Sequence, residues 1–450
     1  MTQPTARAVQ VRRVLPWVSP LSVAAGIADD DGALCLLSDP DVPGSRSFAA
    51  ANPDRVLVVE TTDGALFTPL ETEEWQGGGV VGLGSYDAGA RSATGPRASV
   101  WPDLILARYP AIAVFDHDAR RLALTGWGAT KAEAEAACDA AEIWISRATA
   151  PSSPQAPAPE LVPDAPQGTY LDAVADVVGK IAAGELFQAN IARGWTGALN
   201  AGADPFDVFI RLTQSQGQNA RTAPYGAFWR IGDLALVSNS PELFLACDAA
   251  TGRIETRPIK GTRPRHPDPA CDVALADELL ASAKDRAENL MIVDLMRNDL
   301  ARVCRPGSVV ADRLFEIESH PAVHHLVSTI SGVLNPDAGP AAVLEATFPP
   351  GSITGAPKHQ AMKVIAALEP PRGAWCGSLF VIDEVGDLTA SVLIRTATFQ
   401  RRDGHWYFRT QAGAGIVADS DPEAELQETE AKISALRWAL TGGATAGPAV

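Results

Sequence analysis

The sequence predicts a protein of the α+β class, and three observations support this prediction. Short apolar runs flank Gly-Asp pairs at 232–233 and 386–387, which is typical of β-hairpins. Other segments, such as 130–147 and 282–300, are rich in helix-favouring residues, and the first of them begins with Thr130, a residue that favours the N-cap. Hydrophobic residues make up 46% of the 450 residues and charged residues 20%, so a large core is expected.

The N-terminal region, residues 1–150, is predicted to contain strands and turns followed by one helix. Residues 79–86 form a glycine-rich apolar run typical of a strand, and residues 104–115 and 121–127 indicate a pair of strands. Residues 130–147 are rich in Ala and Glu and predict a helix with Thr130 as its N-cap. Six prolines within residues 151–166 then predict a stiff, exposed linker over 151–167.

The second region, residues 168–440, is predicted to hold further helices and strands. Apolar residues at helical spacing from Leu171 to Ile181 predict a helix that Gly184 ends. Ser240 and Pro241 predict another helix start, because Ser favours the N-cap and Pro the first helical position. Strands are expected at 187–195, 227–230, 234–238, 379–382, 391–399 and 405–416, helices at 282–300 and 421–440, and a loose tail at 441–450.

Composition excludes several classes of function. The 54 acidic residues exceed the 37 basic ones, giving a net charge of −17, which argues against a general nucleic-acid binder. No apolar run approaches the ~18 residues of a membrane span, so no membrane association is expected. None of the six cysteines forms a CxxC pair, which fits a protein of the reducing cytoplasm.

Two glycine-rich motifs resemble nucleotide-binding loops but lack the required context. The glycines at 77–82 precede an apolar strand, whereas a dinucleotide-binding loop follows a strand and opens a helix. The stretch from Pro350 to Lys358 has Ala356 and Pro357 where a phosphate-binding loop has its last glycine. Its backbone N–H groups and Lys358 remain candidates for binding a carboxylate.

Charged clusters leave two interpretations open on sequence grounds alone. Asp285 and Glu288 share one helix face, as do Glu425 and Glu428, so these acids could bind a hard divalent cation or form two solvated surfaces. Around Lys260, three arginines and burial are expected to lower the lysine pKa and produce a nucleophilic amine or an anion pocket, and the alternative is a solvated basic loop. His324 and His325, at a strand start, fit a structural or a catalytic role.

Taken together and in order, the motifs resemble the chorismate-utilising enzymes, which include the large subunits of anthranilate and aminodeoxychorismate synthases. The resemblance is strong over about 168–440 and weaker before it. It rests on Glu242 in SPEL, RPIKGTR at 257–263, AENLMIVDLMRNDL at 287–300, HLVST at 325–329, TFPPGSITGAPK at 347–358, CGSL at 376–379, GAGIV at 413–417 and residues 425–432. It implies an anthranilate synthase component I-like fold, in which two antiparallel sheets form a sandwich with helices outside and both halves of the chain contribute.

The resemblance also implies roles for individual residues. Glu288, Glu425 and Glu428 match carboxylates that hold a magnesium ion against chorismate, and Glu242 matches a glutamate that assists loss of the 4-hydroxyl. A glutamate in a first helical turn is stabilised when ionised, which conflicts with proton donation. Matched substrate contacts are Gln188, Thr262, Thr329, Arg395, Gly413, Gly415 and Lys432, with His325 as a further catalytic match. Trp375 replaces a tyrosine that relatives often carry, so the tyrosine hydroxyl contact is in doubt.

Two positions distinguish the members of this family. Gln188 stands where isochorismate and salicylate synthases carry a water-activating lysine, so ammonia is the expected nucleophile. Lys260 stands where anthranilate synthases carry alanine, and lysine there is characteristic of aminodeoxychorismate synthases. The resemblance implies a covalent lysine intermediate, a 4-amino-4-deoxychorismate product for 4-aminobenzoate or folate biosynthesis, and a separate glutamine amidotransferase subunit that supplies ammonia. The alternatives are an anthranilate synthase, a non-enzymatic ligand-binding relative, and a nucleotide-dependent enzyme using residues 351–358.

Overall fold

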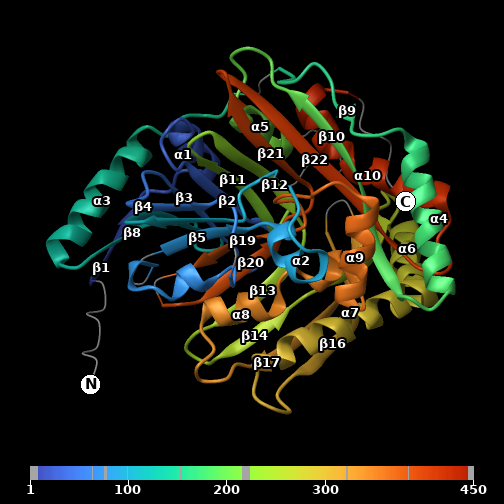
Figure 1. The fold of residues 1–450 in the computed structure, drawn as a ribbon. Coiled ribbons are helices and arrows are strands. Elements are labelled where there is room, and N and C mark those ends of the chain that lie inside the picture. Colours follow the sequence, from blue (N-terminus) through green and yellow to red (C-terminus); the bar gives the residue numbers. More distant parts are fainter. Residues whose placement is uncertain are drawn as a thin grey trace.

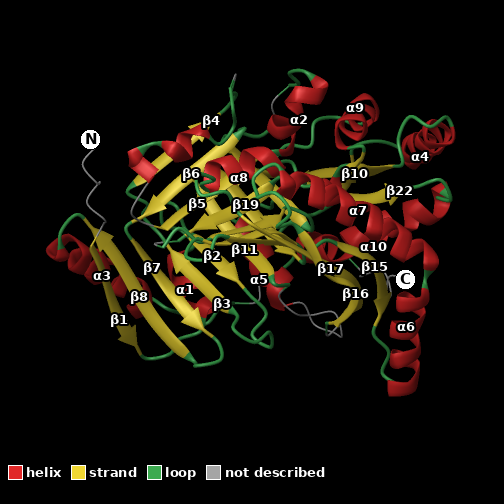
Figure 2. Cartoon of the chain, turned by 90° about the horizontal axis from the view of Figure 1, so that it is seen from below, coloured by secondary structure: helices red, strands yellow, loops and turns green. Residues whose placement is uncertain are grey.

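The computed structural model describes residues 9–62, 64–75, 79–98, 100–152, 155–214, 223–320, 323–383 and 385–443. Within these residues the chain forms two large antiparallel sheets with helices around them (Figures 1 and 2). Helices α4, α6, α7, α9 and α10 lie toward one side of the molecule, and α3 lies on the opposite side (Figure 1). The α+β prediction is confirmed.

The first sheet combines strands from both halves of the sequence. Its order is β1-β8-β7-β3-β2-β11-β12-β21-β22-β10-β18, and β9 adds to β10. The strands are β1 (Val9–Leu15), β2 (Leu34–Leu37), β3 (Arg46–Ala50), β7 (Ala111–Asp116), β8 (Arg121–Gly128), β9 (Val162–Pro163), β10 (Gln188–Ala198), β11 (Tyr225–Ile231), β12 (Leu234–Ser240), β18 (Gly355–Ala356), β21 (Thr396–Arg402) and β22 (His405–Ile416).

The second sheet has the order β15-β17-β14-β13-β20-β19-β5-β6-β4, and β16 pairs with β17. Its strands are β4 (Arg55–Val59), β5 (Gly79–Gly84), β6 (Leu104–Tyr109), β13 (Leu243–Asp248), β14 (Arg253–Thr256), β15 (Ile259–Pro264), β16 (Val310–Ser319), β17 (Val323–Val333), β19 (Ser378–Ile382) and β20 (Leu388–Val392). Buried side chains from both sheets meet in one core, where Val81 and Ile105 of this sheet pack with Ala113 and Leu124 of the first.

The helices have well-defined starts that the sequence predicted in several cases. Thr130 caps α3 by accepting the N–H of Glu133, and Ser282 caps α7 by accepting that of Asp285. The helices are α1 (Pro20–Ile27), α2 (Tyr86–Thr94), α3 (Lys131–Ser146), α4 (Gln167–Ala182), α5 (Pro205–Gln214), α6 (Pro269–Ala281), α7 (Ala283–Ala301), α8 (Pro340–Thr347), α9 (Lys358–Leu368) and α10 (Pro422–Thr441), with 3₁₀ turns η1 (Thr68–Glu71), η2 (Glu73–Trp75) and η3 (Gly351–Ile353).

Three sequence predictions are wrong for one physical reason, which is that the chain crosses between the sheets where a continuous element was expected. Pro241 and Glu242 form no helix start but join β12 of the first sheet to β13 of the second. Residues 104–115 are two strands in different sheets, divided at Pro110, and residues 391–399 are divided at 393–395. Pairing with distant strands therefore overrides the local capping signal of Ser240.

The proline-rich stretch is not exposed throughout. Ala158 is buried and its N–H donates to the carbonyl of Leu440, and β9 pairs with β10. The first two glycines of the 77–82 motif, and residues 444–450 of the expected loose tail, lie outside the described residues. The glycines from 79 onward belong to β5, a buried strand, which agrees with the rejection of a nucleotide loop.

Candidate active site

The candidate site lies where two segments cross between the sheets side by side. Glu242 follows β12, and Arg395 precedes β21. The N–H of Val392 donates to the Glu242 carbonyl at 3.1 Å, and the N–H of Asn239 donates to the Arg395 carbonyl at 3.1 Å. These backbone bonds bring the predicted acid and the predicted carboxylate-binding arginine to the same place.

A second group gathers around Glu288 of α7. Lys260 Nζ from β15 lies 2.9 Å from Glu288 Oε1, and Gln188 Nε2 from β10 donates to the same oxygen at 2.7 Å. Gly415 of β22 lies against this group, because a Cβ there would lie 2.7 Å from Glu288 Oε1, 3.3 Å from Lys260 Nζ and in closer contact with Gln188 Nε2. The structure therefore brings together four predicted site residues from four different elements.

The electrostatics of Lys260 differ from the sequence expectation. Burial lowers its pKa, but the carboxylates of Glu288, Glu242 and Glu428 outweigh this effect and raise the net pKa above the usual lysine value. The flanking arginines are engaged with acids: Arg257 pairs with Glu318, Arg263 with Glu278 and Asp285, and Arg265 with Asp272. The expected lowering of the lysine pKa by adjacent arginines is therefore wrong.

Glu242 has the environment of a proton donor. Its residue is only 5% exposed, and burial raises the pKa of its carboxyl to about 7, against smaller opposing effects from Ser352, Lys260, Lys432 and Arg395. Because Glu242 is on no helix, the conflict between a helix N-terminus and a protonated carboxyl disappears.

Helix α10 presents the other acids and Lys432. Lys432 Nζ lies 2.5 Å from Glu428 Oε1 and donates to the carbonyl of Gly413 at 2.9 Å. Glu425 Oε1 accepts the Ser420 hydroxyl at 2.7 Å. Among the described residues, Glu288, Glu425 and Glu428 do not close into a cluster of metal-ligand geometry.

These three glutamates nevertheless fit a hard divalent cation. All are carboxylates, the ligand type that Mg²⁺ prefers. Burial and the nearby charge of Glu428 raise the pKa of Glu425, partly offset by Ser420, and a cation would relieve this repulsion. Asp285, the fourth acid of the sequence pattern, pairs instead with Arg263 at 3.2 Å.

Thr262 and His325 face each other in the β15–β17 pairing, and Thr329 lies farther along β17, opposite Arg313 of β16. Thr262 Oγ1 lies 3.0 Å from His325 Nδ1, and burial lowers the pKa of His325 to about 3, so the ring is neutral at physiological pH. The Thr329 hydroxyl is buried and has no hydrogen-bond partner within the described chain. Buried polar groups are normally satisfied, so this hydroxyl is suited to a substrate contact.

Trp375 is buried beside Gly413 of strand β22. Its ring lies 3.2 Å from the position of a Cβ at Gly413, and its indole N–H has no partner among the described residues. The guanidinium of Arg372 lies 5.1 Å from the ring centroid. Tryptophan is the strongest cation–π partner, so its ring is well suited to this contact with Arg372.

Lys358 has a structural role. It pairs with Asp299 at 2.5 Å and donates to the carbonyls of Thr347 and Pro349 at 2.9 and 3.0 Å, so its three donors are used. The loop before it supplies a site residue that the sequence analysis missed, because Ser352 lies close enough to Glu242 to lower the pKa of its carboxyl. Only its place in the glycine-rich stretch could have indicated it.

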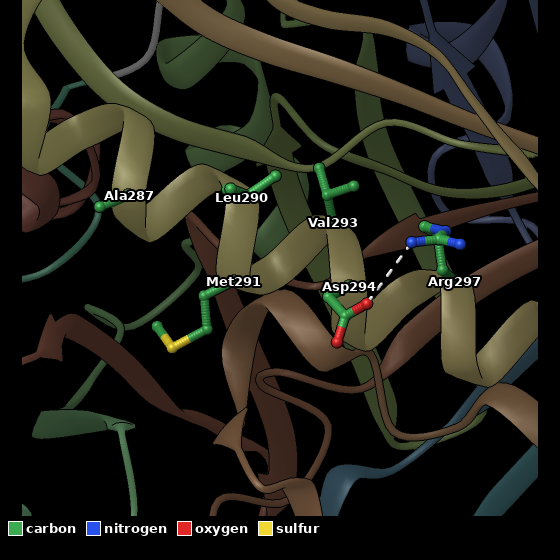
Figure 3. Close-up of a pocket in the computed structure, with 6 residues that line it drawn as sticks. All are labelled: Ala287, Leu290, Met291, Val293, Asp294 and Arg297. Atoms are coloured by element: carbon green, nitrogen blue, oxygen red, sulfur yellow. Dashed lines mark ion pairs between the residues drawn. The ribbon is translucent and has the colours of Figure 1, made fainter.

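A surface groove follows the outer side of α7 (Figure 3). It is lined by Ala287, Leu290, Met291, Val293, Asp294 and Arg297, and Asp294 pairs with Arg297 at 3.6 Å. None of the predicted site residues lines it. Among the described residues, no helix is long and apolar enough to cross a lipid bilayer.

Comparison with known proteins gives three results. Residues 45–437 match the family model described as chorismate binding enzyme. The chain is 40% identical over 446 residues to aminodeoxychorismate synthase component 1 of Salmonella typhimurium, covering 93% of this chain and 92% of the relative. The Escherichia coli protein of the same name is 38% identical over 396 residues, covering 86% and 83%.

Relatives with other names are also similar. Anthranilate synthase component 1 of Streptomyces coelicolor is 34% identical over 460 residues, covering 94% of this chain and 86% of the relative. The crystal structure of anthranilate synthase component I from Streptococcus pneumoniae superposes with a TM-score of 0.73 at 27% identity, covering 88% and 93%. The isochorismate synthase MenF of Escherichia coli superposes with a TM-score of 0.74 at 19% identity, covering 97% and 95%, which shows the shared fold.

Proposed function

The chain belongs to the family of chorismate-binding enzymes, and from that premise we propose that it is the synthase subunit that converts chorismate and ammonia to 4-amino-4-deoxychorismate. One observation carries the proposal. Position 260 is a largely buried lysine whose amine lies 2.9 Å from Glu288, in the same cluster as Gln188. A lysine there supplies a nucleophile, and a glutamine at 188 cannot act as a base toward water.

The proposed reaction has two displacements. In the first, the Lys260 amine forms a bond to C2 of chorismate, the ring double bonds shift, and the C4–O bond breaks. Glu242 gives its proton to the departing hydroxyl, which leaves as water. In the second, ammonia bonds to C4, the double bonds shift back, the C2–N bond to Lys260 breaks, and the proton lost by the new ammonium group returns to Glu242. The net change is exchange of the 4-hydroxyl for an amino group, with the enolpyruvyl group retained.

Lys260 must lose a proton before it can attack. Its ammonium donates toward Glu288 Oε1, so Glu288 is the immediate acceptor within reach. Gln188 donates to the same oxygen and holds that carboxylate in place. Glu242 has no lysine or arginine at ion-pair distance among the described residues, which favours the neutral, donating form that burial produces.

The substrate is a dicarboxylate, and we propose that a different part of the site binds each of its two carboxylates. The Arg395 guanidinium makes no hydrogen bond to the described protein and is available for the enolpyruvyl carboxylate, for which a planar fork is suited. We propose that Glu288, Glu425 and Glu428 hold Mg²⁺, which when bound would supply positive charge for the ring carboxylate.

Ammonia is proposed to come from a separate glutamine amidotransferase subunit. The relatives' name, component 1, supports the existence of a partner component. The deciding experiment incubates the protein with chorismate, magnesium and an ammonium salt, without any added lyase, and identifies the product by mass spectrometry. We expect 4-amino-4-deoxychorismate, with the reaction lost on chelation of magnesium.

Two outcomes would overturn the proposal. Fluorescent anthranilate and free pyruvate would show the anthranilate synthase reaction, which the similarity to the Streptomyces coelicolor protein makes the alternative. Unconsumed chorismate at high ammonium and magnesium would show a ligand-binding protein. A second measurement quenches enzyme with chorismate in the absence of ammonia, and we expect an adduct on the peptide that contains Lys260.

A further inference from the structure

The edge of β10 beside the site is completed by two side chains. β18 pairs with Gln188 and Ala189, and the N–H of Asn190 donates to the Thr354 carbonyl at 2.9 Å. Farther along, the N–H of Asp164 donates to the Gly194 carbonyl at 2.8 Å. Between these two stretches, no strand of the described residues lies beside the carbonyl of Asn190 and the N–H of Ala192.

A buried ion pair fills this gap. The N–H of Ala192 donates to Glu369 Oε1 at 2.7 Å, and Arg372 Nη2 donates to the Asn190 carbonyl at 2.6 Å. Arg372 Nε lies 2.9 Å from Glu369 Oε2, and the two side chains are 0% and 4% exposed. The pair supplies one acceptor and one donor, as a neighbouring strand would.

The same guanidinium reaches a second part of the site. Arg372 Nη1 donates to the Ile353 carbonyl at 3.2 Å, and Ile353 ends the η3 turn that carries Ser352. Ser352 lies close enough to Glu242 to lower the pKa of that carboxyl. The rings of Tyr86 and Trp375 lie 4.6 and 5.1 Å from the guanidinium carbon.

We propose that Arg372, oriented by Glu369, is a positioning residue for the amination, which holds the edge of β10 behind Gln188 and the η3 turn that places Glu242. This inference rests on the proposed function. A buried ion pair is a costly way to stabilise a fold, whereas a planar fork with several fixed donors sets geometry well. Lysine keeps the charge but cannot make these divergent bonds at once.

The test separates the rate constant of adduct formation at Lys260 from the fraction of enzyme that can form the adduct. Wild type and Arg372→Lys are mixed with chorismate without ammonia, quenched over time, and the Lys260 adduct is followed by mass spectrometry. The amplitude reports the fraction of intact sites, and the rate constant reports positioning. We expect the rate constant to fall by about tenfold to a hundredfold with little change in amplitude.

A loss of amplitude alone, or an unchanged rate constant, would overturn the inference. If the wild type forms neither adduct nor 4-amino-4-deoxychorismate, the proposed function fails instead. Should Arg372→Lys not fold, Glu369→Gln is the second variant, because it keeps the acceptor for Ala192 and removes only the charge that orients Arg372; the same two readings then decide.

A double variant tests whether Arg372 and Ser352 act through the same route, and a matched variant elsewhere serves as the control. Ser352→Ala is expected to slow adduct formation about fivefold. The double variant should be at most about threefold slower than Arg372→Lys, because both act through Glu242, and full multiplicative loss would contradict this route. Arg91→Lys is the control: Arg91 also joins a buried carboxylate, Asp103, to a carbonyl, that of Thr62, and neither contact involves Arg372, Glu369 or the η3 turn. We expect its rate constant to match the wild type.

Discussion

Lys260 and Lys358 are both largely buried lysines with one acidic partner, yet their surroundings give them different roles. Lys358 uses its three donors on Asp299 and two backbone carbonyls. Lys260 has one ion-pair partner, Glu288. It lies beside Gly415 and Gln188 and does not donate to backbone carbonyls of the described residues. A lysine whose three donors are all hydrogen-bonded holds parts of the fold together. A lysine with unused donors retains the capacity to react.

Removing Lys260 should have the largest effect. We expect Lys260→Ala to reduce kcat/KM for amination by about a thousandfold or more, since the nucleophile is lost. The melting temperature should fall less than in a Lys358 variant, because Glu288 keeps its hydrogen bond from Gln188 and Lys260 holds no backbone carbonyl within the described chain. Steady-state kinetics and thermal unfolding monitored by circular dichroism measure the two effects. Substantial activity in the folded variant would assign the nucleophile elsewhere.

Removing Lys358 should reverse this pattern. Lys358→Met leaves Asp299 buried without its partner and should lower the free energy of unfolding by about 3–5 kcal/mol. The rate per folded molecule should stay close to wild type. Urea unfolding measures the loss, and Lys180→Met is the matched control, because the exposed Lys180–Asp176 pair should contribute under ~1 kcal/mol. Equal losses in the two variants would contradict the distinction.

The comparison extends to the acids near each lysine. Asp299 has a lysine partner at 2.5 Å, whereas Glu242 has none at ion-pair distance within the described chain and its pKa is raised to about 7. Glu242 must be protonated to donate, so kcat/KM should be constant below this pKa and fall about tenfold per pH unit above it. Glu242→Gln should reduce the rate about a hundredfold and remove this limb.

Filling the space beside Lys260 should have the smallest effect of the four. A Cβ at Gly415 would contact Gln188 and lie 2.7 Å from Glu288 Oε1. We expect Gly415→Ala to raise KM for chorismate about tenfold, at a stability cost of about 1–3 kcal/mol. Gly404→Ala has nothing within 4 Å of the added Cβ but a φ of +79°, so it reports backbone strain without crowding of the site. An unchanged KM in Gly415→Ala would place chorismate elsewhere.

Much of this organisation could be predicted from the sequence where local signals are strong. Thr130 accepts a backbone N–H as the predicted N-cap, and Ser282 and Asp421, the first residues of two predicted helices, cap those helices in the same way. The motifs also placed Lys260, Gln188, Glu242 and Glu288 in one family pattern, and the structure brings them near one another. The roles of Thr329, Arg395 and the magnesium ligands stay predictions.

The sequence by itself determined which residue types stand at each position, the helix starts and the family pattern. Only the tertiary structure decided their electrostatics, because neighbours in space set a pKa and neighbours in the chain do not. The arginines flanking Lys260 turn to Glu318, Glu278 and Asp272, so acids surround the lysine instead. The helix predicted to start at Ser240 does not form, because pairing with distant strands takes the chain from one sheet to the other. That crossing buries the carboxyl of Glu242.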